Sequence, residues 1–260
     1  MRTFHDQLGR NINIPDSINS IICLVPSITE FLYDAGLGEK IVGRTKFCVF
    51  EGHDYKQATI VGGTKQVHFD RIKELNPDII IANKEENTKE IVQELEQDYP
   101  VYVSSIQTIH GAISMMDDLG DILNVKPKVK GLIQDLNEKQ ISFHKKSYPD
   151  IKCIYLIWQK PYMSIGIDTF IYHMLQEMAC TSVVRDFRYP ELSEDEIRNS
   201  SAEFIFLSSE PFPFGEKHKT EIQALFPNKK VILVDGSYFS WYGSRLLYAY
   251  DYMESLRKTI

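Results

Sequence analysis

The sequence predicts an α/β protein of two lobes, each with a mostly parallel β-sheet, joined by a single long backbone helix. Residues 1–105 and 150–260 both alternate short apolar, strand-like runs with helix-like segments, which is typical of parallel sheets covered on both faces. Residues 106–149 contain no convincing strand, although most connections in compact domains span only about 4–6 residues. We therefore expect an N-terminal lobe, a helical connector and a C-terminal lobe over these ranges, with a ligand cleft between the lobes.

Short apolar runs supply the strands expected in the N-terminal lobe. They are Ile21–Val25, Ile41–Gly43, Thr59–Val61, Asp78–Ala82 and Val101–Val103. Helices are expected after the first and the fourth of these strands. Ser27 with Glu30 has capping-box spacing at the start of the first helix, and Asn87 with Glu90 has the same spacing at the start of the second.

The connector is predicted to hold two helices. Apolar residues recur at helical spacing from Ile109, and Asn124–Pro127 interrupts the pattern. Proline suits the first turn of a new helix, so a second helix is expected to run on to Lys146. About twenty residues at a rise of 1.5 Å give a rod of roughly 30 Å, long enough to cross a lobe.

The C-terminal lobe repeats the alternation of strands and helices. Its expected strands are Cys153–Ile157, Phe204–Leu207 and Val231–Val234, and its expected helices include Phe170–Met178 and Leu246–Leu256. Ser193 with Glu196 gives a further capping box between them.

Charge and cysteine usage exclude two classes of function. The net charge is −7 and the basic residues are scattered, whereas nucleic-acid binding normally shows as a basic stripe. The four cysteines form no C-x-x-C pair, and Cys23 and Cys153 lie inside apolar runs. We expect buried free thiols rather than disulfides or a zinc site.

The N-terminal residues and the overall hydropathy bear on location. Met1–Arg10 has no apolar core or small-residue cleavage site typical of a signal peptide. No stretch approaches the roughly 20 apolar residues of a transmembrane helix. The chain as written is therefore expected in the cytoplasm.

Candidate ligand contacts follow the strands, because ligands of open α/β sheets gather outside the carboxyl ends of the strands. Aromatic and polar residues collect at these positions in both halves. The candidate ligand-binding residues are Lys46, Phe47, Thr64, Lys65, Asn83, Lys84, Glu85, Glu86, Trp158, Tyr162, Phe212, Tyr238, Trp241, Tyr242 and Arg245.

Each of these segments also has a purely structural interpretation. Gly62-Gly63 fits a tight turn better than a phosphate loop, because the G-x-x-x-x-G-K-[ST] pattern is absent. Lys84-Glu85-Glu86 fits a solvated helix entrance as well as a cleft wall. About half of the aromatic residues in Phe239–Tyr242 are expected in the core. The sequence holds no G-x-S-x-G, H-E-x-x-H or G-x-G-x-x-G motif, and its histidines have no metal-site spacing. We expect no catalytic residues and no intrinsic metal or cofactor.

Several segments together resemble the cobalamin and iron(III)-siderophore substrate-binding proteins of ABC importers, the helical-backbone class of periplasmic binding proteins. The resemblance runs from Ser20 to the C-terminus. It rests on Ile21–Glu30 with Gly36–Gly38 and Val42–Thr45, on Asp70–Ile72 with Leu75–Ile80, on Gly62–Lys65 and Glu85–Asn87, and on Asp235–Arg245. The last segment is similar to that of a subgroup labelled cobalamin-binding. Membership implies a periplasmic location, whereas the chain as written lacks a signal peptide.

The resemblance implies a binding protein that captures a large, flat, metal-containing ligand and delivers it to a permease. Cobalamin is the first expectation, and a ferric siderophore or haem is the second. Aromatic side chains would cover the apolar faces of the ligand, and charged side chains would meet its polar groups. The protein is expected to be a monomer.

Two other functions remain open from the sequence. A cytoplasmic corrinoid carrier or sensor without a permease would fit the absence of a signal peptide. An enzyme acting on a small molecule would use Glu85 or Glu86 as a general base, although the sequence pairs neither with a nucleophile.

The family also presents one carboxylate on each lobe to the permease. The matching positions are Asp70 and Asp195, each in the first turn of an expected helix, where the helix dipole favours a carboxylate in any case. If they dock, we expect both to be exposed and neither to be held in a salt bridge.

Overall fold

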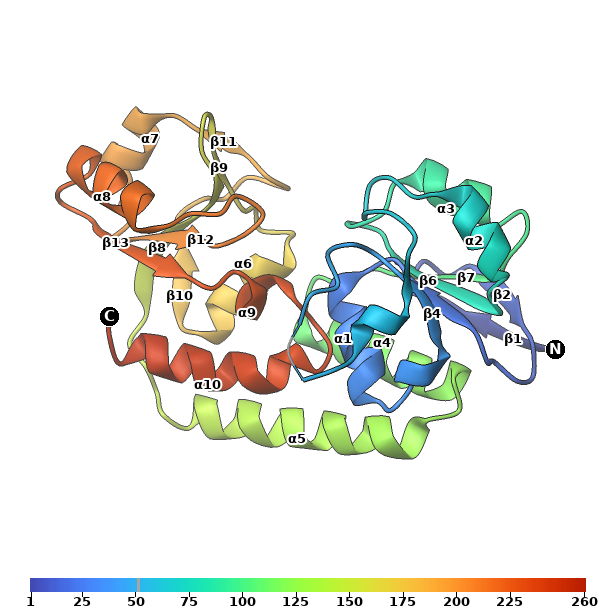
Figure 1. Cartoon of the computed structure of the whole chain (residues 1–260). Helices are drawn as coiled ribbons and strands as arrows, with labels where there is room; N and C mark the ends of the chain where they lie inside the picture. Colours follow the sequence, from blue (N-terminus) through green and yellow to red (C-terminus); the bar gives the residue numbers. More distant parts are fainter. Residues whose placement is uncertain (51) are drawn as a thin grey trace. The chain divides into compact units, whose positions relative to one another are not determined.

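A computed structural model describes residues 1–50 and 52–260, which form two compact units (Figure 1). Unit 1 comprises Met1–Ile106, His110–Asn137 and Tyr242–Arg245, and unit 2 comprises Gln107–Ile109, Glu138–Trp241 and Leu246–Ile260. This division differs from the expected ranges in two places. The helical connector is shared between the units, and four residues near the C-terminus belong to unit 1.

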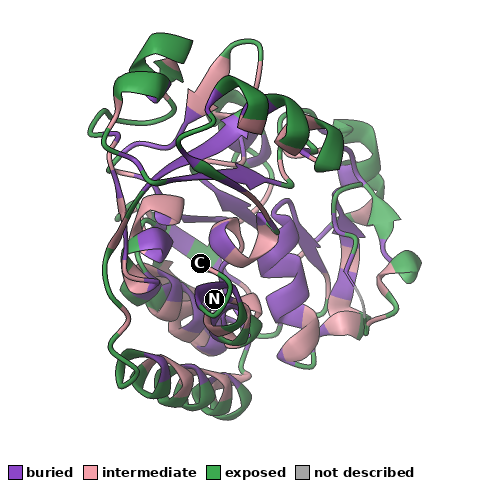
Figure 2. Ribbon diagram, turned by 90° about the vertical axis from the view of Figure 1, so that its left-hand side faces the viewer, coloured by how far each residue is buried: buried purple, intermediate pink, exposed green. Residues whose placement is uncertain are grey.

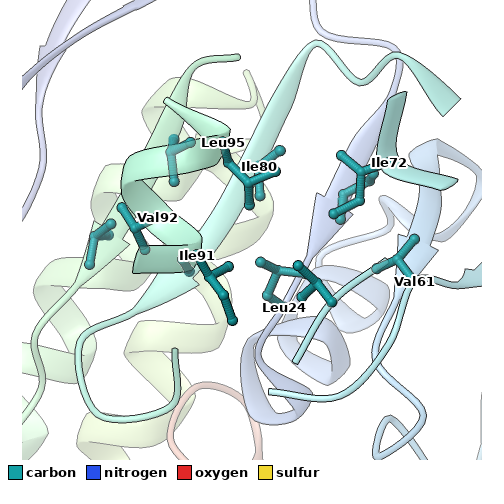
Figure 3. Packing of buried hydrophobic residues seen from close by; sticks show 12 residues of the cluster. Leu24, Val61, Ile72, Ile80, Ile91, Val92 and Leu95 are labelled. Carbon is teal, nitrogen blue, oxygen red and sulfur yellow. The ribbon is translucent and has the colours of Figure 1, made fainter. Parts of the chain in front are cut away.

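Unit 1 is built on a five-stranded, wholly parallel sheet in the order β5-β4-β3-β6-β7. The strands are β3 (Ile21–Cys23), β4 (Ile41–Arg44), β5 (Thr59–Ile60), β6 (Ile79–Asn83) and β7 (Val101–Ser104). All five strands expected from the apolar runs are confirmed. Side chains from the sheet and from the helices that cover it make the core, among them the labelled residues of Figure 3: Leu24, Val61, Ile72, Ile80, Ile91, Val92 and Leu95.

The helices of unit 1 begin at other residues than the capping patterns predict. Its shorter helical segments are α1 (Pro26–Asp34), η1 (Gly38–Lys40), η2 (Tyr55–Gln57), α2 (Phe69–Leu75) and α3 (Lys89–Leu95). The Ser27 cap is wrong, because Pro26 already occupies the first turn and Val25 is the N-cap without a side-chain bond. The Asn87 cap is wrong by one residue, since the Thr88 hydroxyl accepts from Ile91 N at 3.3 Å.

An N-terminal hairpin of β1 (Arg2–His5) and β2 (Asn11–Ile14) was not expected from the sequence. Its turn is organised by Asp6, whose buried carboxylate accepts from Arg10 Nε at 2.8 Å and from Leu8 N at 2.9 Å. The same carboxylate accepts from Val103 N at 3.2 Å. The hairpin is thereby held on β7.

The connector consists of α4 (Ile109–Ile122) and α5 (Lys126–His144). The interruption at Asn124–Pro127 and the second helix after it are confirmed, with Asn124 in the left-handed region at φ 59°. Residues of α5 up to Asn137 belong to unit 1, and those from Glu138 belong to unit 2. This helix is the long backbone helix that the fold class predicts.

Unit 2 contains a six-stranded sheet in the order β11-β9-β8-β12-β13, with β10 also paired to β8. The strands are β8 (Ile151–Trp158), β9 (Tyr162–Ser164), β10 (Cys180–Ser182), β11 (Glu191–Leu192), β12 (Phe204–Ser208) and β13 (Lys230–Val234). β8, β10, β12 and β13 run parallel to one another. β9 runs antiparallel to β8, and β11 runs antiparallel to β9. The three expected strands are confirmed, and the strands β3, β6, β7 and β12 are buried. Buried strands are purple in Figure 2.

The helices of unit 2 are α6 (Phe170–Glu177), α7 (Glu194–Asn199), α8 (Glu216–Leu225), α9 (Ser237–Ser240) and α10 (Arg245–Arg257). The Ser193 and Glu196 capping box is confirmed at α7. Lys139 in the second half of α5 pairs with Asp251 of α10, and Lys146, just beyond the end of α5, pairs with Glu254 of α10. α10 and the second half of α5 run side by side (Figure 1). In the part of the chain that the structure describes, no helix has the length and apolar character needed to span a bilayer.

Candidate functional site

Two sets of loops follow the carboxyl ends of the parallel strands, one in each unit. We call the first the unit 1 rim: the loops after β4, β5 and β6, together with the Tyr242–Arg245 segment. We call the second the unit 2 rim: the loops after β8, β12 and β13. Parallel strands place their carboxyl ends on one edge of a sheet, so each rim gathers residues that are distant in sequence.

Phe47 is the most exposed aromatic candidate of the unit 1 rim, with 51% of its surface accessible. Lys46 Nζ lies 5.0 Å from the Phe47 ring centroid, and Lys46 N donates to Gly62 O at 2.8 Å. A Cβ on Gly63 would lie 3.1 Å from Phe47 Cε2. The absence of a side chain at Gly63 therefore lets the Phe47 ring lie against the neighbouring loop.

The Gly62-Gly63 pair makes a tight turn. Gly62 has φ +130°, and a Cβ there would meet Gln66 O at 2.4 Å. Gly63 N donates to that same Gln66 carbonyl at 2.7 Å. The structural interpretation of this motif is the one that the geometry supports.

Asn83 and Asn87 hold the loop after β6. Asn83 is 1% exposed, and its Oδ1 accepts from Glu85 N at 2.8 Å and Glu86 N at 3.2 Å. Asn87 Nδ2 donates to Thr64 O at 2.9 Å, which joins this loop to the Gly62-Gly63 turn. Asn83 thus acts as a turn-forming residue within the rim.

The charged candidates of this loop reach the surface to different degrees. Lys84 and Lys65 are exposed, and Glu85 and Glu86 are half-buried. Lys65 Nζ donates to Glu85 O at 2.5 Å, so the ammonium lies beside the loop after β6. The unit 1 rim therefore offers an exposed aromatic ring with cations near it.

The Tyr242–Arg245 segment packs on α1 of the same unit. Tyr242 is 5% exposed, and its hydroxyl lies near Ser27. Burial, with Glu86 nearby, raises the pKa of the Tyr242 phenol. Gly243 has φ +89°, and a Cβ there would lie 2.9 Å from Phe31 Cβ. Glycine at this position permits both the left-handed backbone and the close approach to α1.

Arg245 forms a bidentate pair with Glu30, with Nε–Oε2 at 2.9 Å and Nη2–Oε1 at 2.5 Å. The side chains are only 18% and 8% exposed. Burial raises the pKa of the Glu30 carboxyl, and Arg245 opposes that rise. Tyr242 and Arg245 were expected to contact the ligand, and the structure places both in contacts that anchor the segment to α1.

Trp158 is the most exposed aromatic candidate of the unit 2 rim. It is the last residue of β8 and is 40% exposed. Its ring meets Phe212 edge-on at 5.3 Å, and Phe212 N donates to Ile157 O at 3.3 Å. Tyr162, on β9, is half-buried and meets Phe226 at 6.4 Å, which places it partly in the core.

Tyr238 lies in the short helix α9 that follows β13, and Trp241 comes directly after that helix. Trp241 Nε1 donates to Glu210 Oε1 at 3.1 Å, across 31 residues of sequence. Tyr238 stacks on Tyr252 with ring centroids 4.5 Å apart. Glu210 was not among the predicted site residues. Its position two residues after β12 could have marked it as a candidate. Its hydrogen bond with Trp241 could not be predicted from sequence spacing.

The thiols offer no reactive nucleophile. All four cysteines are buried and free, as expected. Burial raises the pKa of Cys23 and of Cys180 to about 12. Within residues 1–50 and 52–260, no group of three or more His, Cys, Asp or Glu side chains could hold a metal ion.

The two expected docking carboxylates fall in the first turns of α2 and α7. Asp70 and Asp195 are both exposed. The expectation that neither is held in a salt bridge is wrong for Asp195, because Arg198 Nη1 donates to it at 2.9 Å. An i, i+3 spacing on a helix brings such side chains together without a partner protein.

Comparison with known proteins assigns the fold and the family. The family model described as periplasmic binding protein matches residues 21–230. The vitamin B12-binding protein of Vibrio campbellii is 26% identical over 203 residues, which cover 72% of this chain and 70% of that protein. An uncharacterized ABC transporter substrate-binding lipoprotein of Bacillus subtilis is 24% identical over 206 residues, which cover 71% of this chain and 61% of that protein.

A solved structure has the same fold. The crystal structure of the periplasmic vitamin B12 binding protein BtuF of Vibrio cholerae matches with a TM-score of 0.80 at 21% identity. The match covers 94% of this chain and 98% of that chain. The arrangement of strands and helices is therefore shared over nearly the whole length of both.

Proposed function

We propose, since the chain belongs to the periplasmic binding protein family, that it captures cobalamin or a related flat metal chelate for an ABC-type importer. The observation that carries this proposal is an exposed aromatic side chain at the strand ends of each unit, Phe47 at 51% and Trp158 at 40%. Exposed aromatic rings at the strand ends are placed where ligands of open α/β sheets bind. The family is one of solute-binding proteins, so the enzyme interpretation is set aside.

The chemistry of the rims suits such a ligand. Aromatic rings offer large apolar faces with little conformational entropy to lose, which favours contact with a planar macrocycle. Lys46 lies beside Phe47, and Lys65 and Lys84 are exposed on the same rim. Cations can bind amide oxygens or carboxylates at the edge of the ligand. Cobalamin carries many peripheral amides, so it is the first candidate.

The relatives support the same choice of ligand. The Vibrio campbellii relative is named as a vitamin B12-binding protein, and the Bacillus subtilis relative as a substrate-binding lipoprotein of an ABC transporter. We infer that this chain acts outside the cytoplasm with a membrane permease. This replaces the cytoplasmic expectation drawn from the N-terminal residues, and it disfavours the cytoplasmic carrier or sensor.

A titration tests the proposal. The purified protein is titrated calorimetrically with cyanocobalamin, haemin and a ferric hydroxamate siderophore in separate experiments. We expect binding of cobalamin at micromolar concentrations or tighter. Binding of haemin or the siderophore alone would transfer the proposal to that ligand. Absence of heat with all three, for a protein shown to be folded by circular dichroism, would refute metal-chelate capture.

Docking to a permease is proposed at Asp70 and Asp195. Exposed charges steer encounter and set register, and their effect weakens with salt. We expect Asp70→Asn and Asp195→Asn to weaken binding to permease-containing vesicles while cobalamin affinity stays unchanged. Glu221→Gln, an exposed carboxylate on α8, is the matched control. Equal vesicle binding by all three variants would remove the docking role.

A further inference from the structure

We infer that Glu210 is a positioning residue that fixes the indole of Trp241 on the unit 2 rim. The inference rests on the proposed function, because its consequence for affinity requires Trp241 to face a ligand. Glu210 lies two residues beyond the end of β12, and Trp241 follows α9. Both belong to unit 2.

The carboxylate gathers two donors from one short segment. Glu210 Oε1 accepts from Trp241 Nε1 at 3.1 Å and from Ser240 Oγ at 2.5 Å. The indole has one N–H and no acceptor, so a single well-placed oxygen decides its orientation. A charged acceptor strengthens such bonds relative to a neutral one.

The backbone around Glu210 is itself held in place. Ser208 Oγ donates to Glu210 O at 2.6 Å, and Gly236 N donates to Ser209 Oγ at 2.9 Å. The first bond fixes the turn after β12, and the second ties that turn to the start of α9. The carboxylate is therefore presented from a fixed peptide, and the donors come from a fixed turn.

Gly236 leaves the space that the Glu210 side chain uses. A Cβ at Gly236 would lie 2.7 Å from Glu210 Cγ and 2.3 Å from Ser208 Oγ. The glutamate methylene thus lies directly against the backbone of Gly236. Any side chain at position 236 would displace the carboxylate from Ser240 and Trp241.

Fixing the indole has a consequence for binding. Trp241 is partly exposed, and an unheld side chain must be ordered when a ligand packs on it. Ordering one such side chain reduces affinity by roughly two- to tenfold. Glu210 removes that loss by holding the ring before the ligand arrives.

The experiment uses the full chain with Trp158→Phe as the parent, because Trp158 and Trp241 are the only tryptophans. Glu210→Ala, Glu210→Gln and Gly236→Ala are compared with it. Glu216→Gln, a carboxylate at the exposed start of α8, is the control. Emission maximum, acrylamide quenching and fluorescence anisotropy are read without ligand in this parent. Cobalamin affinity is read by calorimetry with the same substitutions placed in the unsubstituted chain.

We expect Glu210→Ala and Gly236→Ala to increase quenching and lower the anisotropy of Trp241, and to raise Kd by roughly two- to tenfold. Glu210→Gln keeps an acceptor oxygen and should restore most of both readouts. Parent-like spectra and affinity in Glu210→Ala would overturn the inference. If the unsubstituted chain binds no ligand, the proposed function fails, and the ligand-free spectra still decide whether Glu210 fixes Trp241.

Discussion

At Phe47, an effect of substitution on ligand binding can be measured separately from an effect on the stability of the loop. It is 51% exposed, and its ring rests on Gly63 rather than in the core. Substitutions at such positions normally change the free energy of unfolding by less than about 0.5 kcal/mol. A change in ligand affinity there would report binding alone.

We expect Phe47→Ala to raise the Kd for cobalamin by about tenfold, because a lost aromatic contact corresponds to roughly 1–1.5 kcal/mol. Calorimetric titration measures the effect, and chemical denaturation should show near-parental stability. Val49→Ala is the matched control, since Val49 is 63% exposed in the same loop. Equal affinities for the two variants would exclude Phe47 from the binding surface.

Substitution of Arg245, in contrast, is expected to change stability, because its side chain pairs with Glu30 inside unit 1. Removing one partner of a buried ion pair leaves an uncompensated charge, at a cost of about 3 kcal/mol. We expect Arg245→Ala to lower the free energy of unfolding by that amount at pH 7, measured in guanidinium chloride. Lys217→Ala, whose side chain is 83% exposed beside Glu221, should change it little.

The deficit of Arg245→Ala should depend on pH through Glu30. Burial raises the pKa of Glu30 above its usual 4.5, and loss of Arg245 raises it further. The native state then holds the proton more tightly than the unfolded chain, so stability from this group is complete below pH 4.5 and is lost as the pH rises. The difference in free energy of unfolding between Arg245→Ala and the parent should therefore narrow toward pH 4.5. A difference that does not change with pH would contradict the role of Arg245 as the partner of Glu30.

Sequence reasoning located the rims but not the partners of their residues. Phe47 and Trp158 were chosen as candidates because they follow predicted strands, and position after a strand is a local property. The pairs Arg245–Glu30 and Trp241–Glu210 join residues 215 and 31 positions apart. Which of these side chains is held inside a unit depends on tertiary packing, and spacing does not encode it.

Elements with strong periodicity were predicted well, and short ones were not. α5 and the buried strand β6 follow from long apolar patterns. β9 and β11 have three and two residues, too few to show a period. The Ser27 cap was wrong because its spacing matches a capping box, whereas the helix begins two residues earlier, at Pro26, with Val25 as the N-cap.

The ion pairs of Glu254 on α10 with Lys146 and Lys258 predict an acid-sensitive contact. Hydrogen bonds from Lys146 and Lys258 lower the pKa of Glu254 to about 2. The native state therefore binds this proton less tightly, and the stabilisation is present above pH 4.5 and lost as the pH falls toward 2.

We expect Glu254→Gln to lower the melting temperature slightly at pH 7, because exposed pairs contribute little. The difference from the parent should shrink below pH 4.5 and in high salt. Differential scanning calorimetry between pH 7 and pH 3 measures it. Glu221→Gln serves as the control on α8, and a difference that grows on acidification would disprove the assignment.

At the scale of the whole molecule, the C-terminal residues serve both units. Tyr242–Arg245 belongs to unit 1, and the rest of α10 belongs to unit 2. We expect a chain ending at Trp241 to lose the buried Tyr242 from unit 1 and the α10 contacts from unit 2. Urea unfolding followed by circular dichroism should show both units destabilised, whereas a chain ending at Arg257 should unfold like the full chain. In limited proteolysis, the fragment covering residues 40–137 should be cut faster in the shorter chain than in the full chain. Equal rates of cleavage would contradict the expectation that unit 1 is destabilised.

The place of Tyr242 in unit 1 also fixes an order of events during synthesis. A ribosome releases the N-terminal residues first, and domains generally fold as units while the chain emerges. Here α1 waits for partners that lie more than 200 residues downstream, since Ser244 and Arg245 bond to Asp34 and Glu30 across 210 and 215 positions. Unit 1 is therefore the first to emerge, but its contacts with α1 are complete only after residue 245 has been made. Until then the nascent chain exposes the surface of α1 that these residues cover.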